Sequence, residues 1–101
     1  MFECPHVNGR VELTHEREEH IIARHPDLLP AHRACIAETL HKPDRVLPSA
    51  RVRNALKFAR WFPGVRGGRF AVIVVVVDAG PQPRQWIVTA YLTKHLAEKE
   101  Q

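Results

Sequence analysis

Long hydrophobic stretches are absent from this chain of 101 residues. The longest uninterrupted apolar run covers residues 70–77 and is eight residues long, whereas a helix that crosses a bilayer needs about 20 apolar residues. The first residues also lack the basic and apolar segments of a secretory signal peptide. We therefore expect no association with a membrane and a protein that stays in the cytoplasm.

Cysteine is scarce as well. Cys4 and Cys35 are the two cysteines of the chain, and their spacing matches no paired cysteine motif. Disulfides are rare in cytoplasmic proteins, so we expect two reduced thiols.

Histidine is abundant, with seven residues, but a metal-binding spacing is missing. Residues 15–20 read His-Glu-Arg-Glu-Glu-His. This is one residue longer than the zinc-protease signature, whose two histidines must lie at positions i and i+4 to reach one metal. A zinc site also needs three or four ligands that converge. We expect neither a metal nor another cofactor.

Acidic residues are scarce in the second part of the chain. Residues 42–95 contain ten Lys and Arg but only two acidic residues, a net charge of +8. Residues 1–41 have a net charge of −3 and residues 96–101 add −1, which gives +4 for the whole chain. A cationic surface of this kind attracts polyanions, and nucleic acid is the commonest such partner.

Internal repeats, low-complexity tracts and linkers are absent too. A chain of this length suits one hydrophobic core. We expect a single domain over residues 1–101, with its core in about residues 11–93.

Proline and threonine mark the expected helices. Residues 11–13 alternate as a short strand does. Thr14 suits the N-cap of a helix over residues 15–25, which ends before Pro26 because the residue before proline avoids the α conformation. Pro30 suits the first turn of a second helix.

Three strands are expected after the helices, over residues 53–62, 70–77 and 85–93. The middle one is continuously apolar and β-branched, which is typical of a central strand covered on both faces. This order predicts an α+β fold with an N-terminal strand and two helices packed on a C-terminal antiparallel meander of three to four strands. The helices cover one face of the sheet. For the other face, strong curling of the sheet and cover by a partner both stay open.

His20 is the first candidate for chemistry. Arg17 and Arg24 lie three residues before it and four residues after it, so the three side chains share one edge of the helix. An imidazole carries protons near neutral pH, and flanking guanidinium groups suit a site that cleaves phosphate esters. Alternatively, this edge is a solvated stripe in which Glu16 and Glu19 neutralise the arginines.

His25 lies near the centre of the apolar face of the same helix. It is a candidate for substrate binding. Alternatively, it is a core or helix-end histidine that bonds a backbone group.

The last predicted strand places the hydroxyl groups of Thr89, Tyr91 and Thr93 on one face. Three hydroxyl groups in a row suit the orientation of a phosphate. Alternatively, these residues are ordinary β-formers on a half-exposed face.

The first strand of the meander carries further candidates. Arg60 is in phase with Phe58 and Phe62, so it either extends to solvent or faces a polar cleft. Lys57 and Trp61 belong to the opposite face. Trp61 either offers a stacking surface to a nucleobase or packs in the core.

The order of these motifs resembles the small phage-associated proteins of the barnase–EndoU–colicin–RelE (BECR) nuclease group. In that family a helix with the pattern His-Ile, then Arg-His-Pro-acid, precedes a second helix, a Pro-Asp-x-Val segment and strands that end in Thr-Ala-Tyr/Phe. The corresponding segments here are residues 20–27, 43–46 and 89–91. The similarity covers most of residues 11–93.

The resemblance implies a toxin-type endoribonuclease that cleaves RNA, often tRNA or other translation-linked RNA, without a metal. The ribose 2′-OH would attack the adjacent phosphate. His20 is implied as the general acid or base, and an inhibitor protein is implied as a partner. The candidate catalytic residues are His20, Arg24, Arg60, Thr89 and Tyr91, and the candidate substrate-binding residues are Arg17, His25, Lys57 and Trp61.

A non-catalytic module on the same fold is the second interpretation. Such a module would bind nucleic acid or a protein through its basic sheet, because a fold does not decide a function. An enzyme of the implied kind would lose activity but keep its RNA affinity when His20 is replaced by alanine. A binding module would respond to changes of Lys and Arg instead.

Overall fold

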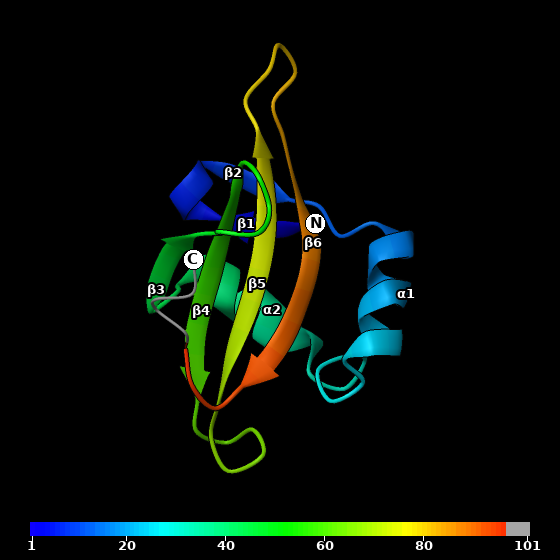
Figure 1. The fold of residues 1–101 in the computed structure, drawn as a ribbon, viewed down its shortest axis with the longest axis vertical. Coiled ribbons are helices and arrows are strands. Elements are labelled where there is room, and N and C mark those ends of the chain that lie inside the picture. Colours follow the sequence, from blue (N-terminus) through cyan, green and yellow to red (C-terminus); the bar gives the residue numbers. More distant parts are fainter. Residues whose placement is uncertain (97–101) are drawn as a thin grey trace.

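The fold combines two helices with an antiparallel sheet, which confirms the predicted α+β class (Figure 1). The computed structural model describes residues 1–96. In chain order the elements are β1 (Phe2–Cys4), the short 3-10 helix η1 (Pro5–Val7), β2 (Gly9–Val11), α1 (His15–Arg24), α2 (Arg33–His41), β3 (Arg45–Pro48), β4 (Ala55–Phe62), β5 (Arg69–Asp78) and β6 (Arg84–Thr93).

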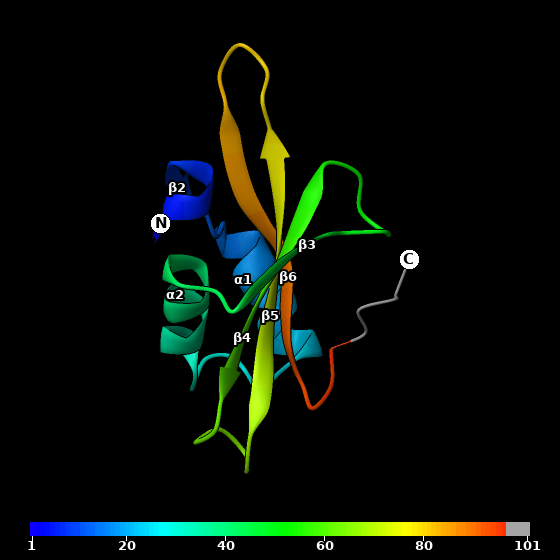
Figure 2. The ribbon, with the colours of Figure 1, turned by 90° about the vertical axis from the view of Figure 1, so that its left-hand side faces the viewer.

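The main sheet has the strand order β3-β4-β5-β6, and all its pairs are antiparallel. The three long strands are those predicted, and β3 is the fourth member at the edge. α2 packs against β4 and β5 on one face, whereas α1 packs against β6 at the opposite edge of the sheet (Figures 1 and 2). Within residues 1–96, no helix is long and apolar enough to span a membrane.

The core lies between the sheet and α2. Phe58, Ile73 and Ala90 are aligned across the three long strands, and all are fully buried. Ile36 and Leu40 of α2 are fully buried as well and belong to the same apolar cluster. Side chains alternate along a strand, so the neighbours of these residues point to the other face of the sheet. We call that other face the open face.

Within residues 1–96, the open face is only partly covered by other segments of the chain. The segment between β3 and β4 extends over this side of the sheet (Figure 2). Residues from that segment and from the end of β6 line two hollows above Val72 and Val74. The described loops therefore border the open face and leave a groove on it.

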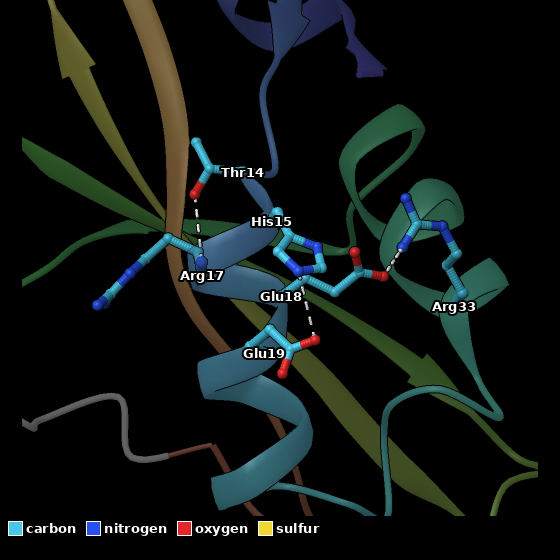
Figure 3. Close-up of polar contacts among 6 residues, drawn as sticks. All are labelled: Thr14, His15, Arg17, Glu18, Glu19 and Arg33. Carbon is cyan, nitrogen blue, oxygen red and sulfur yellow. Dashed lines mark hydrogen bonds and ion pairs between the residues drawn. The ribbon is translucent and has the colours of Figure 1, made fainter.

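Helix α1 begins at the predicted cap. The hydroxyl oxygen of Thr14 accepts a hydrogen bond from the Arg17 N–H at 3.2 Å (Figure 3). The helix ends at Arg24, and His25 is its C-cap, directly before Pro26. On the side toward α2, Glu18 forms an ion pair with Arg33.

A β-bulge interrupts the pairing of β5 with β6. Val74 pairs with Thr89 whereas Val75 pairs with Ile87, so Val88 has no partner in the ladder. The Val88 carbonyl instead accepts a hydrogen bond from the Arg17 guanidinium at 3.2 Å. This bond ties α1 to the edge of the sheet.

Three details differ from the prediction. The N-terminal strand is Gly9–Val11 rather than 11–13, because it pairs with β1, which sequence periodicity did not indicate. Pro30 does not open the second helix, which begins at Arg33. Residues 26–32 instead form turns that fully bury Leu28 and Leu29 beneath the core.

Both cysteines are free and buried. Burial raises the pKa of the Cys4 thiol, although backbone hydrogen bonds at Val7 and His6 oppose the shift. Burial also raises the pKa of Cys35, and the negative charge of Glu38 adds to that effect. Both thiols are therefore held neutral in the folded protein.

We predict that these thiols make stability fall in alkaline solution. The pKa of each thiol is higher in the folded state, so the free energy of unfolding is unaffected below the ordinary value of 9.0 and decreases as the pH rises above it. Urea unfolding in the presence of a reductant, compared between the wild type and the C4A/C35A variant, measures this contribution. Equal pH dependence of the two proteins above pH 9.0 would contradict it.

Candidate functional site

Two adjoining hollows form a groove across the open face, which we call the sheet groove. The Thr89 hollow has a volume of about 390 Å³ and the Thr93 hollow about 290 Å³. The Thr89 hollow is lined by His25, Ser49, Arg51, Val52, Lys57, Val74, Thr89 and Tyr91, and the Thr93 hollow by Leu47, Arg51, Lys57, Ala59, Val72, Tyr91, Thr93, His95 and Leu96. The residues common to both are Arg51, Lys57 and Tyr91, so these mark the centre of the groove.

Strand register sets the order of the groove residues. Lys57 is paired with Val74, and Val74 with Thr89, so these residues form one row across three strands. In the next row Val72 is paired with Tyr91. The two valines form the apolar floor of the groove. The amine of Lys57 lies on one side of this floor, on β4, and the hydroxyl groups of Thr89 and Tyr91 lie on the other side, on β6.

His25 forms the wall of the Thr89 hollow. As the C-cap of α1 it leaves the helical conformation, with φ −136° and ψ 65°. Its imidazole lies beside the phenol ring of Tyr91, with ring centroids 5.9 Å apart. The bond from Arg17 to the Val88 carbonyl holds α1 against β6 and thereby keeps this contact in place.

Arg51 reaches the groove from the loop between β3 and β4. The Ser49 hydroxyl accepts a hydrogen bond from the Val52 N–H at 3.1 Å, and the Ser49 N–H bonds the Ala55 carbonyl at 2.9 Å. These bonds close the loop tightly around Arg51. Charged side chains on surface loops are often used for binding.

The sheet groove has a positive charge at its centre. Arg51 and Lys57 contribute cations, and none of the described residues that line the two hollows is Asp or Glu. Imidazole and hydroxyl groups surround these cations. Such a groove suits an anionic ligand, and a phosphate group combines the required charge with hydrogen-bond acceptors.

Four of the residues predicted from the sequence meet in this groove. They come from α1, β4 and β6, and they are His25, Lys57, Thr89 and Tyr91. Lys57 and Tyr91 lie at its centre. Of the histidines predicted as site residues, it is His25 that lines the groove, the residue for which the sequence left a structural role open.

Three of the arginine and histidine candidates lie on α1 beside β6. Arg17 points toward β6, whereas Glu18 points toward α2 (Figure 3). His20 and Arg24 follow Arg17 along the same edge of the helix. Neither lines the two hollows, so the structure places His20 near the rim of the sheet rather than in the groove.

Arg60 and Trp61 lie outside the two hollows. Arg60 belongs to the face that packs on α2, where its guanidinium donates to the Lys42 carbonyl at 2.8 Å and lies over the Phe62 ring. Trp61 belongs to the open face but lies further along β4, against Phe70. Arg60 is therefore on the opposite side of the sheet from Lys57.

Sequence reasoning missed three polar groove residues, namely Ser49, Arg51 and His95. Each lies outside the periodic segments, in the loop before β4 or directly after β6. The only signal for Arg51 was the general excess of cations in residues 42–95. No local pattern could indicate where these loops cross the sheet.

Among residues 1–96, no three His, Cys, Asp or Glu side chains form a group that could hold a metal ion. Comparison of the chain with protein-family models, with curated proteins and with solved structures gives no match. The groove itself is therefore the basis for any statement about function.

We predict that the groove cations dominate the binding of a polyanion. The variants R51Q and K57Q should each reduce the slope of log K against log salt concentration by about 0.7, the value for one lost contact with a single strand. Fluorescence anisotropy with a labelled oligo(dT) measures this slope. The control is K42Q, because Lys42 is exposed at the end of α2 and lines neither hollow. An equal reduction of this slope in K42Q would contradict a role for the groove.

Proposed function

We propose that this protein is a small endoribonuclease that cleaves RNA without a metal, by attack of the ribose 2′-OH on the adjacent phosphate. The observation that supports it is the convergence of Arg51, Lys57, His25 and Tyr91 in one groove. This set contains the cations, the proton carrier and the proton donor that the reaction requires.

The scissile phosphate would lie at the centre of the sheet groove. Arg51 and Lys57 line both hollows and reach the centre from a loop and from β4. Negative charge grows on the phosphate oxygens as the pentacovalent state forms. Cations that are already in place stabilise that charge without a cost of reorganisation.

His25 and Tyr91 would transfer the protons. A neutral imidazole accepts the proton of the 2′-OH, and a phenol, which is protonated at neutral pH, can donate a proton to the departing 5′-oxygen. The two rings lie next to each other, with centroids 5.9 Å apart. Thr89, in the same hollow, would bond a non-bridging phosphate oxygen.

The remaining candidates have supporting roles in this proposal. Arg17, His20 and Arg24 follow the edge of α1 beside β6, where they would contact phosphates next to the cleaved one. The BECR resemblance adds that the target is tRNA or another translation-linked RNA in the cytoplasm. It also adds an inhibitor protein as a partner.

A non-catalytic RNA-binding module is the second candidate. One observation favours it: Arg60, which the resemblance implies as a catalytic cation, bonds the Lys42 carbonyl on the far face of the sheet. A groove that binds phosphate but lacks part of a catalytic set would bind RNA and leave it intact.

The cleavage assay uses single-stranded RNA with EDTA and detects products with 2′,3′-cyclic phosphate ends. We expect the wild type to produce them, and H25A and Y91F each to lower kcat by about 10²- to 10⁴-fold, because each removes one proton-transfer group. Y91F keeps the ring beside His25 and removes only the hydroxyl group. RNA affinity should change little in both variants.

The matched control is H15A, because His15 is an exposed histidine on α1 that pairs with Glu19 (Figure 3) and lines neither hollow. H20A tests the residue that the resemblance implies, and we expect it to retain most activity. Loss of activity in H20A together with full activity in H25A would indicate that the reaction takes place at the edge of α1 and not in the sheet groove. RNA binding without any cleavage by the wild type would favour the binding module.

A further inference from the structure

Trp61 is a large apolar side chain on the open face that remains exposed. Its exposed fraction is 41%, which is unusual for a tryptophan in a β-strand with a packed sheet around it. It lies near the end of β4, further along the strand than Lys57 and on the same face. Neither the core nor the proposed reaction uses this residue.

The indole is held in a fixed position. It packs edge-on against Phe70, with ring centroids 4.9 Å apart and an interplanar angle of 67°. It also lies directly on the backbone of Gly68, where an added Cβ would be only 2.6 Å from the ring. The backbone N–H of Trp61 donates to the Asp44 carboxylate at 2.8 Å. One side of the indole ring is thus covered by Phe70 and Gly68, while the rest of the side chain is exposed to solvent.

The sheet groove continues toward this ring. A third hollow of about 330 Å³ adjoins the Thr93 hollow, because His95 and Leu96 line both. We call it the Phe70 hollow. Phe70 lines it together with the cations of Arg45 and Lys94 and the carboxylate of Asp44. Since Phe70 contacts Trp61, the indole lies beside the Phe70 hollow, where two cations and one carboxylate leave a net positive charge.

The spacing suits a nucleotide chain. The row that contains Lys57 and Val74 is four residues from Phe70 along β5, which corresponds to roughly 13 Å. That length accommodates the cleaved phosphate and an adjacent nucleotide. A base at the far end would meet an exposed aromatic ring, and its phosphate would meet Arg45 and Lys94.

We propose that Trp61 is a stacking platform for an unpaired nucleobase next to the cleaved phosphate, which makes single-stranded RNA the substrate class. This inference rests on the proposed function, because it takes the sheet groove as the path of the RNA backbone. Stacking on an aromatic side chain requires a base that is free of its own stack.

The binding experiment uses DNA so that no cleavage is needed, because deoxyribose has no 2′-OH to attack the phosphate. We expect W61A to weaken the binding of a short single-stranded oligonucleotide about tenfold, and W61F to keep most of the affinity, because a phenyl ring still stacks. The same sequence in a duplex should bind more weakly to the wild type and be insensitive to W61A.

Trp86 provides the matched control. It is the only other tryptophan of the chain, lies on β6 under the guanidinium of Arg84, and pairs with Val76, six residues from Phe70 along β5. W86F should bind the oligonucleotide as the wild type does. In this variant Trp61 is the single tryptophan, so its fluorescence should be quenched when a base stacks on it.

The outcomes separate this inference from the proposed reaction. Loss of oligonucleotide binding in W61A without RNA cleavage by the wild type would support the platform and refute the nuclease. Cleavage by the wild type with unchanged oligonucleotide affinity in W61A, and unquenched Trp61 fluorescence in W86F, would refute the platform alone. Equal binding of single strand and duplex would refute the assigned substrate class.

Because Trp61 is largely outside the core, a similar Tm of W61A and the wild type confirms that folding is intact.

Discussion

The alternation of side chains along β4, β5 and β6 is the constraint on which the rest of the molecule depends. Each residue that packs on α2 has neighbours that point into the sheet groove. Lys57 stands between Leu56 and Phe58, and a shift of the strand by one residue would bury the amine and expose the phenyl ring. Burial of Phe58 in the core therefore holds Lys57 in the groove. Stability and candidate chemistry share the same strands but occupy opposite faces.

The second constraint is the attachment of α1 to the edge of the sheet. The bulge at Val88 leaves a carbonyl without a ladder partner, and Arg17 uses it. This bond, together with burial of Ile21, fixes the position of the C-terminal end of α1 relative to the sheet. The ring of His25 consequently lies beside Tyr91, although the two residues are far apart in the sequence. An irregularity in one strand thus brings an imidazole to the hydroxyl groups of the sheet.

The groove combines features that are ordinary individually. Valines supply a floor, a loop and a strand supply two cations, and a helix end supplies an imidazole. Positive charge attracts any polyanion, whereas an acid, a base and a stacking surface select among them. The proposed ribonuclease activity and the Trp61 platform depend on this combination and not on the fold alone, since one fold serves many functions.

The sequence by itself determined the local elements. Thr14 and Pro26 bound the first helix, continuous β-branched residues define β5, and alternation places Thr89 and Tyr91 on one face. These features depend on near neighbours, whose geometry repeats with a known period. The same period places Arg60 on the face of Phe58, opposite to Lys57. In the structure the Arg60 guanidinium bonds the Lys42 carbonyl on that face.

Only the tertiary structure decided which side chains meet. His25 rather than His20 lines the groove, and Arg51 enters it from a loop. The hairpin of β1 and β2 also depends on pairing that no local pattern indicates. The physical reason is that a period specifies the face of an element, whereas the contact between two elements depends on how their buried surfaces pack. In this protein that packing, and not any local motif, places an imidazole beside a phenol in a groove that two cations also line.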